Sequence, residues 1–301
     1  MLDKQDSHND QSPNSFAKLG ILAGHGALPK QVIAACHEQN RPCFVIAFND
    51  ITEDDTVNNI PHHWEHIAKV GKILKRFKSE GVTEILMAGR VGRPPLTSLR
   101  PDFSGWKLLA TLKKLPTQGD DQVFSAIINF IEKSGFDVVG AESILQNLLI
   151  EEGTLGSIEP DEIAEQDIIL GAKSARAIGH MDIGQAVIVQ QGCILGVEGV
   201  EGTDRLISRC AELHTDGLGG VLVKMKKPQQ DSRVDLPSIG VHTIENAYRS
   251  GLRGIAVEAG GALVIDRKSV IDKADERGIF ITGVLAPTDN QNITTGTGKH
   301  L

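Results

Sequence analysis

The segment from Lys224 to Gly240, KMKKPQQDSRVDLPSIG, contains a dense mixture of side chains that could carry out chemistry. Its four basic residues are Lys224, Lys226, Lys227 and Arg233, and its two aspartates are Asp231 and Asp235. Basic side chains bind phosphate oxygens, whereas carboxylates hold a hydrated divalent metal ion or orient an attacking water. The combination predicts a site for a phosphorylated substrate. The alternative is a solvated loop without a ligand.

Two glycine-rich blocks, DIGQA (residues 182–186) and EGVEGTD (residues 198–204), flank a predicted hairpin in the second half of the chain. The second block has three carboxylates within seven residues, namely Glu198, Glu201 and Asp204. Carboxylates at this density are candidate ligands for a divalent metal ion. The alternative is that Thr203 and Asp204 simply begin the following helix. Glu258 ends a predicted strand and is a further candidate carboxylate.

Two turns in the first half of the chain each follow a predicted strand: GHGALP at residues 24–29 and GRVGRP at residues 89–94. In a doubly wound parallel sheet, both turns lie at the carboxyl edge of the strands, where ligands bind. Glycine lets the backbone approach a ligand, the start of a helix attracts anions, and Arg90 or Arg93 could clamp a phosphate. GHGALP departs from the dinucleotide-binding GxGxxG pattern because Pro29 replaces the third glycine. A tight turn without a ligand is the alternative.

Composition excludes several functional classes. The chain has 301 residues, of which 40% are hydrophobic, so it can form one large domain or two ordinary ones. A net charge of −8 and an aromatic content of 4% argue against nucleic-acid binding. Its four cysteines form no CxxC motif, which is typical of buried thiols in a reducing compartment.

Targeting signals also bear on location. No stretch approaches the roughly 20 apolar residues that span a bilayer. Residues 1–16 are polar and lack the pattern of a signal peptide, so they are expected to be a disordered lead-in. The sequence therefore predicts a cytoplasmic protein and leaves peripheral contact with a membrane open.

The elements that must position these residues alternate between strand and helix. Apolar runs and helical periodicity predict the elements of the first half: strands at 18–23, 43–48, 82–88 and 136–139, with helices at 29–39, 66–80, 106–115 and 121–134. In the second half they predict helices at 160–178, 203–213, 243–250 and 267–277, with strands at 186–190, 193–197, 220–224, 254–258 and 279–282. Short alternating units indicate an α/β fold with a parallel sheet in the first half and a mixed arrangement in the second.

The glycine- and glutamate-rich stretch EEGTLGSIE indicates where the chain divides. We therefore expect a lead-in at 1–16, an N-terminal domain at 17–150, a linker at 151–159, a C-terminal domain at 160–286 and a flexible tail at 287–301.

The motifs, taken in order, resemble the LpxI-type UDP-2,3-diacylglucosamine pyrophosphatases. The resemblance runs from about Lys18 to Val284 through LGILAGHGALP, GRVGRP, GDD, EEGTLG, DIGQAVIV, EGVEGTD, VLVKMKKPQQDSRVDLPSIG and GIAVEAG. The blocks of the second half are the more specific ones, and the GHG turn replaces a GGG-like turn expected in relatives.

The resemblance implies a Mg²⁺-dependent hydrolase of the lipid A pathway of Gram-negative bacteria, with Mn²⁺ as an alternative metal. Such enzymes cut UDP-2,3-diacylglucosamine into UMP and 2,3-diacylglucosamine 1-phosphate (lipid X), with water attacking the α-phosphorus. It also implies a Rossmann-like N-terminal domain, a C-terminal domain of family-specific fold, a homodimer and transient contact with the inner membrane.

Roles for individual residues follow from the chemistry and the resemblance together. Asp235 is the first candidate to orient the water or hold the metal, and Asp231 is the second. The substrate-binding candidates are Gly24, His25, Gly26, Leu28, Arg90, Gln185, Thr203, Lys224, Lys226, Lys227 and Arg233. The metal candidates are Asp235, Glu198, Glu201 and Asp204. Two other functions stay open: a non-catalytic nucleotide-sugar sensor, and a nicotinamide-dependent oxidoreductase that uses the glycine turn.

Overall fold

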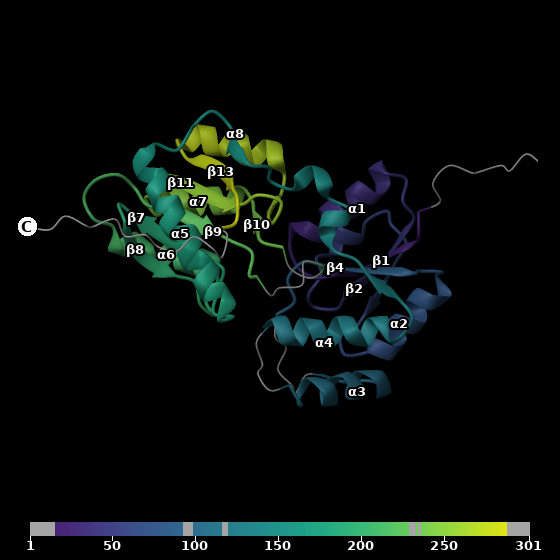
Figure 1. The fold of residues 1–301 in the computed structure, drawn as a ribbon. Helices are drawn as coiled ribbons and strands as arrows, with labels where there is room; N and C mark the ends of the chain where they lie inside the picture. The colour runs from purple at the N-terminus through teal and green to yellow at the C-terminus, as the bar shows by residue number, and fades with distance from the viewer. Residues whose placement is uncertain (1–15, 93–98, 116–119, 229–232, 234–235, 288–301) are drawn as a thin grey trace, which may run out of the picture. The chain divides into compact units, whose positions relative to one another are not determined.

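The computed structural model describes residues 16–92, 99–115, 120–228, 233 and 236–287 (Figure 1). The chain divides into two compact units. Unit 1 comprises Met1–Gly105 and Ile131–Val138, and unit 2 comprises Trp106–Phe130 and Val139–Leu301. Each unit contains its own main sheet, so the α/β class expected from the sequence is confirmed.

Unit 1 is built on a five-stranded parallel sheet in the order β3-β2-β1-β4-β5. Its strands are β1 (Leu19–Ala23), β2 (Cys43–Phe48), β3 (His62–Glu65), β4 (Glu84–Ala88) and β5 (Asp137–Val138). Helices α1 (Ala27–Glu38) and α2 (Val70–Ser79) lie on opposite faces of this sheet (Figure 1). The strand order reverses between β1 and β4, and such a switch point places a crevice at the carboxyl ends of the strands.

The core of unit 1 explains why its central strands are continuous apolar runs. Both faces of the sheet are covered, so alternate side chains have no solvent to point into. Gly20 leaves space for Phe77 of α2, because a Cβ at position 20 would lie 2.8 Å from that ring. Phe77 in turn meets Phe44 and Phe136 edge-on.

Further elements lie between these strands in sequence or follow β5. They are the 3₁₀ turns η1 (Asp54–Val57), η2 (Ala141–Ser143) and η3 (Gln146–Leu148), with helices α3 (Phe103–Leu112) and α4 (Asp120–Glu132). Asp102 fixes the start of α3, because its carboxylate accepts hydrogen bonds from Gly105 N at 2.8 Å and Lys72 N at 3.0 Å.

Unit 2 contains a six-stranded mixed sheet in the order β6-β13-β11-β9-β7-β8. Its strands are β6 (Gly153–Leu155), β7 (Ala186–Gln190), β8 (Cys193–Val197), β9 (Val221–Lys224), β11 (Gly254–Glu258) and β13 (Phe280–Val284). Strands β9, β11 and β13 are parallel, and the outer pairings are antiparallel. The predicted β7–β8 hairpin is present, and a small separate pair joins β10 (Ser238–Ile239) to β12 (Leu263–Val264).

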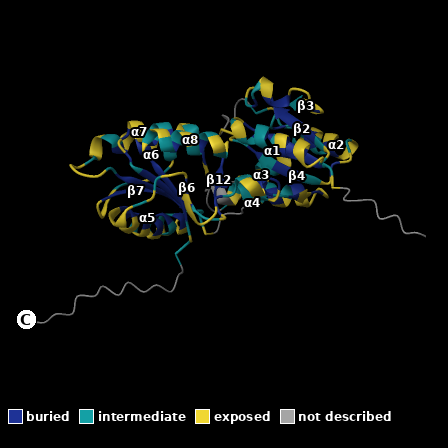
Figure 2. Ribbon diagram, turned by 90° about the horizontal axis from the view of Figure 1, so that it is seen from above, coloured by how far each residue is buried: buried dark blue, intermediate teal, exposed yellow. Residues whose placement is uncertain are grey.

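Helices cover both faces of the unit 2 sheet. Helix α5 (Glu162–His180) packs on the face that includes Val189 and Val223. Helices α6 (Thr203–Cys210), α7 (Val241–Arg249) and α8 (Arg267–Arg277) pack on the face that includes Ile188 and Leu222. Neighbouring strand residues thus belong to different core clusters, as the two-residue period of a strand requires. Figure 2 shows the buried strands between α5 and the three helices on the other side.

Candidate functional site

Three sequence-predicted residues meet at one edge of the unit 2 sheet. Lys224 ends β9, and Gln185 immediately precedes β7. Because β7 runs antiparallel to β9, its first residue pairs with the last residue of β9: Ala186 lies opposite Lys224. Glu258 ends the neighbouring parallel strand β11. The carboxyl edge of β9 and β11 therefore gathers side chains that the sequence places far apart.

Lys224 is a largely buried lysine. The residue is only 8% exposed, and within the described part of the chain no hydrogen bond or ion pair is formed by its amino group. Partial burial of a cation without a counter-charge costs free energy. A position of this kind favours an anionic ligand, which supplies the missing charge.

Glu258 lies beside the basic segment on the edge of the sheet. Its Oε2 accepts a hydrogen bond from the backbone N–H of Lys226 at 3.0 Å, which holds the chain directly after β9. Burial raises the pKa of the Glu258 carboxyl, although that hydrogen bond and the charges of Arg176 and Lys226 act in the opposite direction. A carboxyl of this kind can hold or release a proton closer to neutral pH than an exposed one.

Lys227 forms an ion pair with Asp182. Its Nζ lies 2.6 Å from Asp182 Oδ1, just past the end of α5. Gly179, in the last turn of α5, allows the close approach, because a Cβ there would lie 3.4 Å from Lys227 Cα and 3.3 Å from Pro228 Cδ. The beginning of the Lys224–Gly240 segment is thus fixed against α5.

Glu198 organises the backbone around Gln185 and Thr203. It is 5% exposed, and its two oxygens accept hydrogen bonds from Gln185 N at 2.9 Å and from Thr203 Oγ1 at 2.8 Å. Gly184 allows this arrangement, because a Cβ there would lie 2.2 Å from the Glu198 carbonyl oxygen. The side-chain Oε1 of Gln185 is buried and has no hydrogen-bond partner among the described residues.

Glu201 and Asp204 have partners of their own. Glu201 lies 3.0 Å from the Arg209 guanidinium and accepts a hydrogen bond from Gly199 N. Its own backbone amide and Arg209 hold the pKa of its carboxyl below the usual range. Asp204 accepts a hydrogen bond from Asn246 Nδ2 at 3.3 Å.

These contacts bear on whether the carboxylates fit a metal ion. Both oxygens of Glu198 and of Glu201 are engaged by protein donors. Among the residues that the structure describes, no three His, Cys, Asp or Glu side chains converge as metal ligands would. The described carboxylates alone do not fit Mg²⁺, and the metal assignment stays a prediction.

The two candidate catalytic aspartates, Asp231 and Asp235, lie outside the described residues. Both ends of the segment that contains them are held in place. The first end is fixed by Lys226 and Lys227, and at the second end Pro237 O accepts a hydrogen bond from Leu263 N at 2.8 Å. Arg233 is half-buried and has an interaction partner.

The two glycine turns of unit 1 do lie at one edge of their sheet. His25 and Arg90 exchange backbone hydrogen bonds, both of 2.9 Å, and Gly24 N donates to Ala88 O at 2.7 Å. Gly24 and Gly89 make this contact possible. A Cβ on Gly24 would lie 2.7 Å from Arg90 O, and Gly89 has a φ of +87°.

The other candidates in this turn lie at the start of α1. Gly26 caps the helix with a φ of +103°, and Leu28 is half-buried in the first helical turn. The side chains of His25 and Arg90 are exposed, and His25 Nδ1 lies 3.4 Å from Glu53 Oε1. Arg93 lies outside the described residues.

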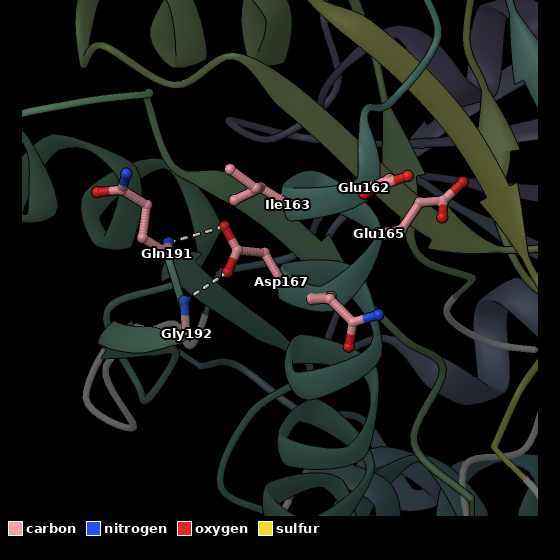
Figure 3. A pocket seen from close by; sticks show the side chains of 7 residues that line it. Glu162, Ile163, Glu165, Asp167, Gln191 and Gly192 are labelled. Atoms are coloured by element: carbon pink, nitrogen blue, oxygen red, sulfur yellow. Dashed lines mark hydrogen bonds between the residues drawn. The ribbon is translucent and has the colours of Figure 1, made fainter.

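A separate surface hollow lies at the opposite end of β7 and of α5 (Figure 3). Asp167 of α5 forms its floor and accepts hydrogen bonds from Gln191 N at 2.9 Å and Gly192 N at 2.7 Å. Its remaining lining residues include the acidic side chains of Glu162 and Glu165. The hollow would repel a phosphorylated substrate, and Asp167 serves to hold the β7–β8 turn.

Sequence reasoning did not single out Arg176 or Asp182. Arg176 is one basic residue on an amphipathic helix, and a solvated helix face has many such residues. Asp182 carries a signal that could have been used. It is the first residue of the DIGQA motif. In the structure it adopts a φ of +55°, which is uncommon outside glycine.

No helix in the described part of the chain is long and apolar enough to cross a membrane. The fold is that of a two-unit α/β protein with lysines at and just after the carboxyl end of β9. Comparison with known proteins assigns the family. The LpxI N-terminal domain model matches residues 18–148, and the LpxI C-terminal domain model matches residues 151–282. The chain belongs to the LpxI family.

A curated relative supports the same assignment. The chain is 39% identical over 273 residues to the UDP-2,3-diacylglucosamine pyrophosphatase LpxI of Caulobacter vibrioides. That alignment covers 89% of this chain and 97% of the relative, so the similarity extends over both units.

Proposed function

We propose that this protein hydrolyses the pyrophosphate bond of UDP-2,3-diacylglucosamine to UMP and 2,3-diacylglucosamine 1-phosphate, a step of lipid A biosynthesis. The similarity to the Caulobacter vibrioides pyrophosphatase over nearly its whole length supports the substrate. The order of strands in unit 1 supports a Rossmann-like N-terminal domain, because the reversal next to β1 is the one such folds use for nucleotides.

The observation that carries the proposal is Lys224 at the end of β9. A pyrophosphate diester brings two negative charges, and attack at phosphorus adds charge to the equatorial oxygens. A nearly buried ammonium group without a counter-charge among the described residues is suited to offset that charge. Lys226 and Arg233 on the same segment are proposed to bind the remaining phosphate oxygens.

The hydrolytic step needs one water and one proton acceptor. Water oxygen bonds to the α-phosphorus, the bond from that phosphorus to the bridging oxygen breaks, and the diacylglucosamine 1-phosphate leaves. We assign the positioning of the water and the acceptance of its proton to Asp235, with Asp231 as the second candidate. Gln185 is proposed to accept a hydrogen bond from the substrate through its unpartnered Oε1.

Dependence on Mg²⁺, or on Mn²⁺ in its place, is part of the proposal and rests on the family resemblance. Such an ion would stabilise charge on the phosphate oxygens. The described carboxylates do not assemble a site for it. We therefore assign no step of the reaction to the metal, and chelation by EDTA tests the requirement.

The proposed setting is the cytoplasm. The diacylated substrate implies transient contact with the inner membrane, and the family resemblance implies a homodimer. A non-catalytic nucleotide-sugar sensor is the second candidate, and its specific support is that a cationic strand edge suits anion binding whether or not turnover follows. The oxidoreductase alternative gives the lysine-rich edge no role.

Replacement of the aspartates separates these functions. Asp231→Asn and Asp235→Asn keep side-chain size and remove the charge. We expect one of them to lose UMP release by at least about 100-fold while still binding UDP-2,3-diacylglucosamine in calorimetry. If the wild-type protein binds the substrate but releases no UMP with or without Mg²⁺, the sensor replaces the hydrolase.

A further inference from the structure

Helix α3 is an apolar helix that does not bury its large side chains. It contains Phe103 and Trp106, and Gly105 is its only buried residue. Phe103 is 87% exposed and Trp106 is 59% exposed. Helices of water-soluble proteins normally turn such side chains toward the core. An exposed aromatic pair indicates a surface with a partner.

Lysines lie on and directly after this helix. With about 100° of rotation per residue, Phe103, Trp106 and Lys107 lie on the same side of α3, and Lys113 and Lys114 follow directly after its end at Leu112. All three lysines are exposed, and residues 103–115 contain no Asp or Glu. We call these five residues the α3 face. It is apolar and basic on a chain whose net charge is −8.

The start of α3 is fixed in place. Asp102 accepts backbone hydrogen bonds from Gly105 and Lys72. Partial burial pulls the pKa of Asp102 up, but the backbone amides of Gly105, Gly71 and Lys72 outweigh it and hold that pKa below the usual range. Gly105 has no space for a side chain, because a Cβ there would lie 2.2 Å from Ala68 O. The aromatic pair is therefore presented by an anchored turn.

We propose that the α3 face docks the protein on the anionic surface of a phospholipid bilayer. Aromatic side chains insert at the boundary between head groups and acyl chains, and lysines are attracted to anionic lipids. A second copy of the chain is a poorer occupant, because a symmetric contact would bring the three lysines of each copy together. The choice of a lipid surface rests on the proposed function, since a substrate with two acyl chains resides in a bilayer.

Tryptophan fluorescence reads the contact directly. The chain has two tryptophans, so Trp64→Phe leaves Trp106 as the sole reporter. We expect its emission to shift to shorter wavelength on vesicles of phosphatidylglycerol and phosphatidylethanolamine, and to be quenched by brominated acyl chains. Vesicles of phosphatidylcholine alone should give a much smaller change, and added salt should weaken the effect.

Co-sedimentation of full-length variants with vesicles tests which surface binds the bilayer. Replacing the three lysines of the α3 face by Gln should lower binding by about 100-fold, and Phe103→Ala with Trp106→Ala should lower it by at least tenfold. Two matched controls should bind like wild type. One is Ile169→Ala, which removes an exposed apolar side chain of α5. The other is Lys75→Gln with Lys78→Gln, on α2, whose Ile73 and Phe77 are buried.

Other outcomes overturn the proposal. Wild-type binding by the α3 variants, or an equal loss in the α2 control, would remove the α3 face as the docking surface. If the aromatic double variant turned a dimer into a monomer in light scattering and kept vesicle binding, the face would join two copies. UMP release from substrate in detergent micelles separates the two proposals. If the α3 variants lost vesicle binding and neither they nor the wild-type protein released UMP, the hydrolase would be contradicted and the docking proposal would stand.

Discussion

Lys224 illustrates how one side chain can be positioned for a ligand at the cost of stability. It lies at the end of a buried strand, the residue is largely buried, and the described residues offer its amino group no counter-ion. Lys227 differs, because its ion pair with Asp182 satisfies it within the protein. The two lysines are three residues apart on the same segment, yet only Lys224 is available to an anion.

Lys224→Met should therefore separate function from stability. Methionine keeps the length of the side chain and removes a buried charge, so we expect an unchanged or higher melting temperature. UMP release should fall by on the order of 100-fold, because a cation that stabilises the transition state is gone. The control is Lys268→Met, which removes an exposed surface ion pair with Asp272 on α8 and should change neither quantity. An active Lys224→Met enzyme would contradict the site.

Glu258 predicts a pH dependence of stability. Because burial raises its pKa above the ordinary 4.5, the folded protein binds this proton more tightly than the unfolded chain does. Its contribution to stability is complete below 4.5 and is lost as pH rises through the folded pKa. Glu258→Gln has no such proton and keeps an acceptor for Lys226 N. As the pH rises from 4.5 through the folded pKa of Glu258, the melting temperature of Glu258→Gln measured by calorimetry should increase relative to that of wild type.

A matched control accompanies that measurement. Glu212→Gln removes an exposed carboxylate from the same unit and should show no such trend. A difference between Glu258→Gln and wild type that stays constant across the pH range would mean that Glu258 is not a buried, proton-holding group.

Two local contacts position the loops at the ends of the strands. In unit 1, the contact between the β1–α1 turn and the loop after β4 depends on two glycines, Gly24 and Gly89. In unit 2, the hairpin turn opposite the candidate site depends on Asp167 of α5. The glycine contact lies at the carboxyl edge of its sheet, whereas Asp167 lies at the far end of β7 from the candidate site.

Gly24→Ala should destabilise the fold. The added methyl group would lie 2.7 Å from Arg90 O, so the two turns must separate, at a cost of roughly 1–3 kcal/mol. Gly92→Ala, in the loop after β4, is the control, because a Cβ there meets nothing within 4 Å. Its effect should stay within about 0.5 kcal/mol. Urea denaturation measures both. Equal stability of the two variants would show that the turns are not in contact.

Asp167→Asn should lower stability without touching catalysis. The amide replaces an oxygen that accepts from Gln191 N or Gly192 N, and losing a hydrogen bond to a charged group costs roughly 1.5–3 kcal/mol. UMP release at a permissive temperature should match wild type, because Asp167 lies at the far end of β7 from Gln185. Glu165→Gln, at the rim of the same hollow, should change neither property. A specific loss of turnover in Asp167→Asn would move the site toward Figure 3.

At the scale of the whole molecule, the positions of the strands could be predicted from the sequence where they are continuous apolar runs. Strands β1, β2, β4, β7, β9 and β11 coincide closely with predicted runs, because burial on both faces requires unbroken apolar sequence. Strand β3 escaped prediction because HHWE is a polar edge strand, and β10 and β12 are too short to show a period. Helix α2 begins at Val70 and not at His66, because Ala68 N donates to the His66 ring and forms a separate turn.

The candidate site was predictable in part for a related reason. Lys224, Gln185 and Glu258 flank apolar runs, so the strand pattern brought them to one edge. Arg176 lies on a helix where nothing in the sequence marks it. Glu198 shows the limit of spacing arguments, because a carboxylate that binds backbone amides and one that binds a metal have the same spacing in a sequence.

The most direct test of the central claim is UMP release from UDP-2,3-diacylglucosamine in ¹⁸O-labelled water, followed by mass spectrometry of both products. We predict that the protein releases UMP and that ¹⁸O appears in UMP, because water attacks the α-phosphorus. If ¹⁸O appears in the diacylglucosamine 1-phosphate, attack occurs on the other phosphorus and the assigned geometry is wrong. The absence of UMP under any metal condition would contradict hydrolysis altogether.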